Sequence, residues 1–142
     1  MTIARFEKTV RAAYTGRAMN LLAGTIVGQL VDTSLYTPDF ANHEFLSSIP
    51  AGARLGAPFV LSGKSLSAAN VFDAADVVAH DFGAPLGASG EAIVLLESTG
   101  TDATSPLILW IDQDANGAIS APIGSPGLSV TWSDGANKIM RV

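Results

Sequence analysis

The sequence contains no cysteine. This absence excludes disulfides, thiolate nucleophiles and zinc sites built on cysteine. Charged residues are also scarce, at 15% of the chain compared with about 25% in a typical soluble domain. Because a free monomer normally needs more surface charge to stay soluble, the shortfall predicts that other chains cover part of the surface.

Long apolar runs are missing as well. The longest ones, such as Ala92–Leu96 and Pro106–Ile111, are far too short to span a bilayer. Glu7 and Lys8 lie where a signal peptide would need an unbroken apolar core. We therefore expect neither a membrane partner nor an export signal.

The net charge of −5 is unevenly distributed along the chain. Residues 1–17 contain one acidic residue, Glu7, and four basic ones: Arg5, Lys8, Arg11 and Arg17. The remaining 125 residues carry 4 basic and 12 acidic side chains. This acidic body disfavours direct binding of nucleic acid. The basic N-terminal element is typical either of a solvated helix face or of a surface that docks on an acidic protein.

One helix is predicted, over residues 3–16. Its apolar residues recur at helical spacing and form one face: Ile3, Phe6, Val10 and Tyr14. The basic residues Arg5, Lys8 and Arg11 fall on the opposite face. Thr2 is the expected N-cap, and Gly16 is the expected C-terminal stop.

The pattern of residues 25–142 predicts a β-rich body. The two continuous apolar runs, 91–97 and 107–111, are typical of central strands covered on both faces. The other predicted strands are 25–31, 58–61, 71–72, 77–82 and a terminal hairpin formed by 128–132 and 138–142. About seven or eight short strands with Gly- and Pro-rich turns indicate a β-sandwich or partly open barrel. We expect one mainly β domain over residues 1–142, with the helix packed on it.

A long connection, residues 33–57, contains the densest group of reactive side chains, between Tyr36 and Arg54. Such a connection usually forms an active site or docks on a partner. Asn42 is expected to cap one helical turn, His43–Ser48, which Pro50 ends.

Three polar residues of this connection, Asp39, His43 and Glu44, are close enough in sequence to suggest a metal site. They lack a fourth ligand, so we favour the interpretation that they cap the turn and hold the loop in shape. No cofactor is expected.

Other motifs are incomplete. Asp112–Gly117 matches the first half of a calcium-binding EF-hand loop, but Ile123 occupies the position of the required bidentate carboxylate, so a β-turn is favoured. Gly63-Lys64-Ser65 resembles the end of a phosphate-binding loop, but Pro58 replaces the earlier glycine, which favours a tight turn. No catalytic signature surrounds His43 or His80, and the chain is not expected to be an enzyme.

Three segments resemble a family of small virion proteins of tailed bacteriophages. They are Y-T-P-D…H-E-F-L-S-S-I-P-A-G-A-R from Tyr36 to Arg54, E-A-I-V-L-L-E-S-T-G-T-D-A-T-S-P-L-I-L-W-I-D from Glu91 to Asp112, and the closing V-T-W-S-D-G-A-N-K-I-M-R-V. An opening helix followed by a strand that ends in Leu30-Val31-Asp32-Thr33 also fits. The similarity covers most of the chain, although none of these segments has known chemistry.

The resemblance implies a capsid cement, or decoration, protein on the outer surface of the virion. Its partner would be a major capsid protein of the HK97-like fold, and its role would be to bridge capsomers and stabilise the head. Self-contacts or a homo-oligomer on the capsid are expected, with assembly in the host cytoplasm. The candidate contact residues are an electrostatic face of Arg5, Lys8 and Arg11, and apolar anchors at Tyr36, Phe40 and Phe45.

Two alternatives remain open. A tail or neck structural protein would share this composition. A carbohydrate-binding β-sandwich for host attachment would stack sugars on an exposed tryptophan. Trp110 is expected in the core, whereas Trp132 precedes a turn and is the candidate platform.

Overall fold

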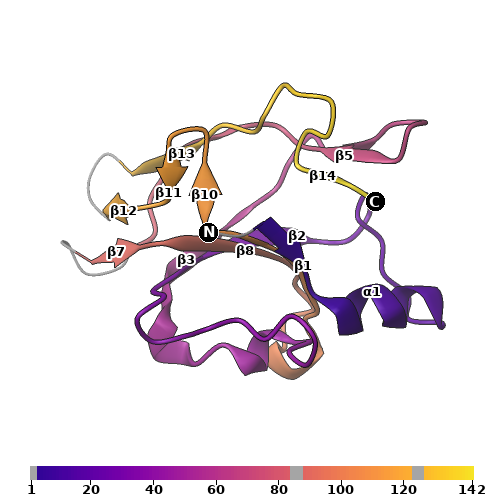
Figure 1. Ribbon diagram of the computed structural model, residues 1–142, viewed down its shortest axis with the longest axis horizontal. Coiled ribbons are helices and arrows are strands. Elements are labelled where there is room, and N and C mark those ends of the chain that lie inside the picture. Colours follow the sequence, from indigo (N-terminus) through magenta and orange to yellow (C-terminus); the bar gives the residue numbers. More distant parts are fainter. Residues whose placement is uncertain (1–2, 84–87, 123–126) are drawn as a thin grey trace.

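A computed structural model describes residues 3–83, 88–122 and 127–142. Its centre is a five-stranded antiparallel sheet in the order β1-β9-β8-β2-β3. In that order the strands are Ile3–Arg5, Leu107–Ile111, Ala92–Glu97, Ile26–Val31 and Arg54–Val60. Small β-ribbons cover one face of the sheet, and helix α1 (Glu7–Tyr14) and the long connection cover the other (Figure 1).

The central strands have apolar side chains on both faces. In β8, Ile93 and Leu95 belong to the cluster under the ribbons, whereas Val94 and Leu96 belong to the cluster under the helix and the connection. Successive side chains of a strand point to opposite faces, so a continuous apolar run must be buried on both faces of the sheet. This confirms the prediction that 91–97 and 107–111 form strands covered on both faces.

A buried amide fixes the pairing of β2 with β3. The register shifts between Gly28 and Leu30, where one residue of β2, Gln29, lies opposite residues 56–58 of β3. The Gln29 side chain is buried there, and its Nε2 donates to the carbonyl oxygens of Leu55 at 3.2 Å and Gly56 at 3.3 Å. These bonds give the carbonyl groups of Leu55 and Gly56, which lie near the register shift, a hydrogen-bond donor. Buried polar groups require such a partner.

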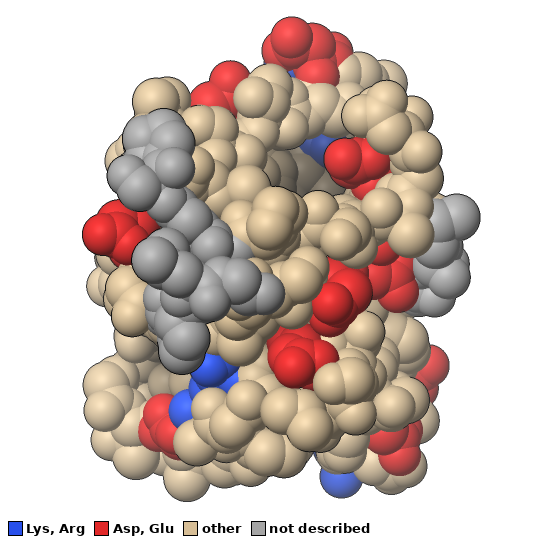
Figure 2. Space-filling model, turned by 90° about the vertical axis from the view of Figure 1, so that its left-hand side faces the viewer, with Lys and Arg blue, Asp and Glu red and all other residues tan. Residues whose placement is uncertain are grey.

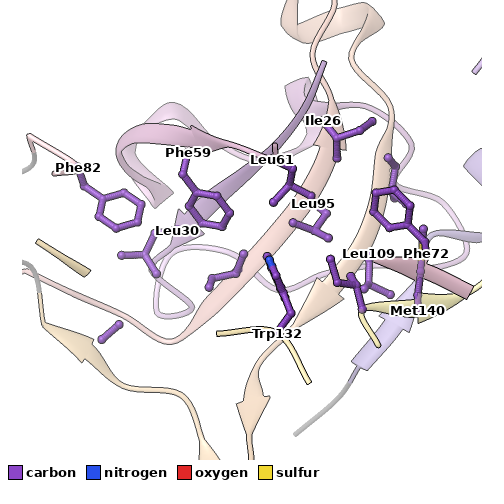
Figure 3. Close-up of a cluster of buried hydrophobic side chains, with 14 residues drawn as sticks. Ile26, Leu30, Phe59, Leu61, Phe72, Phe82, Leu95, Leu109, Trp132 and Met140 are labelled. Carbon is purple, nitrogen blue, oxygen red and sulfur yellow. The ribbon is translucent and has the colours of Figure 1, made fainter. Parts of the chain in front are cut away.

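The ribbon layer consists of four small sheets, β14-β5-β4, β13-β6, β12-β7 and β10-β11. Their strands are Ser65–Leu66 (β4), Val71–Asp73 (β5), Val77–His80 (β6), Ser89–Gly90 (β7), Gln113–Asp114 (β10), Gly117–Ala118 (β11), Ala121–Pro122 (β12), Leu128–Val130 (β13) and Met140–Arg141 (β14). Their apolar side chains meet those of the central sheet around Phe59, Phe72 and Trp132 (Figure 3).

The second layer contains α1 and three short 3₁₀ helices, η1 (Leu46–Ser48), η2 (Ala51–Ala53) and η3 (Asp102–Thr104). Phe6, Ile49 and Trp110 are buried in its cluster. The connection also satisfies the start of α1, because Glu7 donates its backbone N–H to the carbonyl of Phe40 at 2.8 Å. First-turn amides have no partner within a helix, so this contact ties the two segments together.

The mainly β class with one α-helix is confirmed, but the predicted helix 3–16 was too long. Residues 3–5 form strand β1, because pairing with β9 satisfies their backbone, and the helix begins after Phe6. Tyr14 was expected on the buried face but is 83% exposed. The predicted cap, Thr2, lies outside the described residues.

Several strand predictions need correction. The described residues form fourteen short strands rather than seven or eight, and β3 begins at Arg54, which ends the connection earlier than residue 57. The predicted terminal hairpin is wrong: β13 pairs with β6, and β14 pairs with β5. Ser89–Gly90 form a short strand, β7, that was not predicted from the sequence.

The motif predictions have mixed outcomes. The turn at 112–117 is confirmed, since β10 and β11 pair there and Asn116 donates its backbone N–H to Asp114 Oδ1 at 2.7 Å; Ile123 lies outside the described residues. Gly63 lies in the bend between β3 and β4 with φ +58°. The sugar platform at Trp132 is wrong, because the ring is buried and its Nε1 donates to the Ala75 carbonyl at 3.2 Å.

The close approach of Gly28 to Phe59 gives a test of core packing. A Cβ on Gly28 would lie 2.1 Å from Phe59 Cζ, and the ring is held by Phe82 and Trp132. We expect Gly28→Ala to destabilise the protein by about 1–3 kcal/mol in urea unfolding, as overpacking does. Gly52→Ala is the matched control, since its Cβ meets nothing within 4 Å. Equal stability of both variants would contradict this packing.

Candidate protein-docking groove

The reactive side chains of the connection bond mainly to one another and to neighbouring backbone. His43 Nδ1 lies 2.7 Å from Tyr36 Oη and 3.1 Å from the backbone nitrogen of Asp39. A backbone N–H can only donate, so Nδ1 is the acceptor and the tyrosine hydroxyl donates to it. Burial, with a smaller contribution from the Asp39 charge, raises the pKa of Tyr36 to about 12. The hydroxyl therefore keeps its proton and holds the loop.

Asp39 caps a turn in place of the predicted Asn42. Its Oδ1 accepts the backbone N–H groups of Ala41 and Asn42, each at 3.1 Å. Its Oδ2 accepts the Asn42 side-chain amide at 2.9 Å. The amide of Asn42, followed by these backbone donors, holds the pKa of the Asp39 carboxyl below its usual value. The predicted helical turn 43–48 is instead the 3₁₀ helix η1, which begins at Leu46 without a side-chain cap.

Two arginines fasten the connection to the rest of the molecule. Arg54 donates from Nε to the Ile49 carbonyl at 2.9 Å and from Nη1 to Asp102 Oδ2 at 2.6 Å. Arg17 forms an ion pair with Glu44 and lies over the ring of Phe45, 4.8 Å from its centroid. Asp39, His43 and Glu44 thus all take part in bonds that hold the loop in shape, as the favoured interpretation predicted.

The structure separates the six predicted contact residues. Tyr36 is buried 5.7 Å from Trp110 and is not available as a surface anchor. The ring centroids of Phe40 and Phe6 are 5.4 Å apart, and Phe45 lies half-buried under Arg17. Both aromatic rings therefore pack against residues of the same molecule. The basic residues Arg5 and Arg11 are exposed and Lys8 is half-buried.

A smaller pocket of about 300 Å³ lies beside the start of the connection. Tyr36 and Trp110 line it together with the carboxylates of Glu91 and Asp112. Glu91 Oε2 accepts the backbone N–H of Thr33 at 3.0 Å, and Asp112 Oδ2 accepts the Trp110 indole N–H at 3.2 Å. Glu91 therefore holds the start of the connection, and Asp112 holds the Trp110 ring.

A larger groove, of about 470 Å³, is predominantly apolar. It lies between α1, the following segment 19–22 and the C-terminal strand β14, with Ile108 of the central sheet also lining it. Among the described residues, seven large apolar side chains are exposed, and four of them line this groove: Tyr14 (83%), Leu22 (47%), Leu66 (40%) and Val142 (47%). Such a concentration of exposed apolar side chains is typical of a protein-binding surface.

One basic side chain, Arg5, lines the groove and forms its basic rim. Its Nη1 donates to the backbone carbonyl of Arg141 at 3.5 Å, whereas the Arg141 side chain donates from Nε to the Ala69 carbonyl at 3.5 Å. Arg11 is one helical turn from Tyr14. The nearby carboxylates are Glu7 on α1 and Glu97, whose Oε2 accepts the backbone N–H of Asn20 at 3.2 Å. The groove thus combines apolar walls with a basic rim, which suits an apolar, acidic partner surface.

Of the predicted basic face, Arg5 lines the groove and Lys8 and Arg11 do not, and sequence reasoning missed the groove itself. Tyr14 was assigned to the buried helix face by its spacing, and Leu22, Leu66 and Val142 carry no local signal of exposure. They meet only because β14 pairs with β5 and the segment after α1 turns back beside it.

The described residues contain no metal cluster. Within 3–83, 88–122 and 127–142, no three His, Asp or Glu side chains are grouped so as to hold an ion. None of the helices in these ranges has the length and apolar character needed to cross a bilayer. Comparisons with protein-family models, curated proteins and solved structures found no match.

The Tyr36 hydroxyl gives a test of the connection at high pH. Unfolded Tyr36 ionises near its ordinary pKa of 10.0, whereas the folded value is about 12, so its contribution to stability is complete below pH 10 and declines between pH 10 and 12. We expect Tyr36→Phe to cost about 1 kcal/mol near neutral pH through loss of the His43 bond. The deficit should shrink above pH 10, as measured by urea unfolding at several pH values.

The exposed Tyr14 supplies the control. Tyr14→Phe should not change stability near neutral pH, since the Tyr14 side chain is 83% exposed. A deficit for Tyr36→Phe that is constant from pH 7 to 12 would contradict the assigned role of the hydroxyl.

Proposed function

We propose that this chain is a non-enzymatic structural protein of a tailed-phage virion, a cement or decoration protein on the outer surface of an HK97-like capsid. There it would bridge capsomers and stabilise the head. The resemblance of the segments Tyr36–Arg54 and Glu91–Asp112 to small virion proteins supports the viral setting. The observation that carries the proposal is the apolar groove with its basic rim, a surface suited to docking on protein.

The physical character of the groove supports docking on a protein. Specific interfaces have an apolar centre that excludes water and a polar rim that sets orientation. Tyr14 and Leu22 supply exposed apolar surface for such a centre, and Arg5 supplies a charged group at its rim. Burial of these side chains by a partner would also account for the low overall charge of the chain.

The roles of the polar side chains in the connection support a structural over a catalytic function. His43, the best candidate general base, accepts hydrogen bonds from Tyr36 and Asp39 at the ring nitrogen that faces the loop. His80, the second histidine, has its Nε2 2.9 Å from the Ala57 carbonyl. Both histidines thus have structural partners in positions that fix loops and strands.

Imaging of particles tests the proposal. We expect capsids assembled with the protein to show density repeated over the shell lattice, and capsids assembled without it to lack that density. The variant Tyr14→Ser/Leu22→Ser should reduce lattice occupancy strongly, because it removes two exposed apolar groups of the groove. The matched control is Val60→Ser, a 62% exposed apolar residue outside the groove, which should decorate like the wild type.

The pattern of density discriminates between the two virion functions. Density confined to one vertex would replace the cement function with the tail or neck alternative. Unchanged lattice occupancy of Tyr14→Ser/Leu22→Ser would overturn the assignment of the groove as the docking surface. The carbohydrate alternative required an exposed Trp132 on which a sugar could stack, and this side chain is buried.

A further inference from the structure

We propose that the occupant of the groove is the Asp32–Leu35 turn of a second copy of this chain, bound head to tail. The inference rests on the proposed function in one respect, that the groove is a protein-docking surface. It adds the identity of the partner and the geometry of the contact. Two features of the turn carry it: an exposed apolar side chain, and an acidic setting that complements the basic rim.

The turn is a rigid, projecting apolar tip. Asp32 Oδ1 accepts the backbone N–H of Ser34 at 2.9 Å and its hydroxyl at 2.6 Å, and Leu35 donates its N–H to the Asp32 carbonyl at 3.2 Å. Thr33 donates its backbone N–H to Glu91 Oε2 at 3.0 Å. These bonds hold Leu35, which is 57% exposed, in one place. A tip that is ordered before binding loses little conformational entropy in the complex.

The charges of tip and groove are complementary. Leu35 lies in a stretch that contains Asp32 and Asp39, and Glu91 is bonded to the same turn. The groove is lined by Arg5, and Arg11 lies one helical turn from its lining residue Tyr14. The side of the molecule opposite α1 shows more acidic than basic side chains (Figure 2). An acidic tip entering a basic rim gains attraction, whereas two rims facing each other would repel.

The tip and the groove lie at opposite ends of the sheet. Asp32 follows Val31, which pairs with Ala92 at the first residue of β8. The groove lies at the other end of β8, where Asn20 donates its backbone N–H to Glu97. One molecule therefore cannot fill its own groove with its own tip. A contact between two different patches is heterologous and produces a ring if the rotation closes, or an open chain if it does not.

The other exposed apolar side chains outside the groove fit less well. Val60 and Val78 lie within strands β3 and β6, so neither projects from a turn. Leu35 alone among these three is held at the tip of a hydrogen-bonded turn.

Complementation between variants tests the head-to-tail contact in the purified protein. Leu35→Ser removes the tip, and Tyr14→Ser/Leu22→Ser removes the groove; all three residues are exposed, so both variants should fold. By sedimentation velocity at low salt we expect the wild type to self-associate with rising concentration. Each variant alone should lose this association by more than about tenfold in Kd, as loss of an interface anchor does. Val78→Ser is the matched control and should behave like the wild type.

Mixing the two variants gives the decisive measurement. One intact groove and one intact tip remain in the mixture, so a 1:1 dimer should form and growth should stop there. Higher salt should weaken wild-type assembly because the charged rim is screened. Wild-type protein that stays monomeric, or variants that associate as well as the wild type, would overturn the inference. So would a mixture that forms no dimer.

The outcomes separate this inference from the proposed function. If the wild type is monomeric while Tyr14→Ser/Leu22→Ser still abolishes lattice density on capsids, the groove binds a shell protein and only the inference fails. If the wild type self-associates through the groove but never decorates a capsid, the proposed function fails and the inference stands.

Discussion

The fold depends on one constraint: β8 and β9 carry apolar side chains on both faces and must be covered twice. Their backbones are satisfied by pairing within the sheet, so the remaining requirement is to exclude water from Val94 and Trp110 on one side and from Leu95 and Leu109 on the other. The ribbons meet one half of this requirement. A single short helix is too small to meet the other, so the long connection completes that layer.

This requirement explains why the connection is rich in polar residues and yet rigid. A segment that lies on an apolar sheet must satisfy its own backbone, because water is excluded beneath it. Asp39 supplies acceptors for one turn, Arg54 supplies donors for carbonyls of another, and His43 joins the loop to the buried hydroxyl of Tyr36. The concentration of reactive side chains in the connection is therefore explained by its role in covering the sheet. The apolar groove is not filled by the connection and remains available to a partner.

The sequence specified those parts of the fold whose causes are local. The apolar runs 91–97 and 107–111 predicted central strands because the run itself requires burial on both faces. Residues 3–5 were assigned to the helix because their spacing is helical, but their strand partner β9 lies about a hundred residues later. The same cause misplaced β13 and β14. Of the candidate site, only Arg5 was among the residues named from the sequence, because the apolar groove arises from segments distant in sequence and has no local signature.

The positions of the two tryptophans determine what intrinsic fluorescence can reveal about unfolding. Trp110 is buried in the layer with α1, and Trp132 is buried in the layer of ribbons. Intrinsic fluorescence is therefore the sum of two reporters, one on each side of the central sheet. If the layers melt together, that signal and the circular dichroism of the backbone share one transition. If one layer opens first, the fluorescence and circular-dichroism transitions occur at different points. The tryptophan whose fluorescence stays native then identifies the side of the sheet that is still covered.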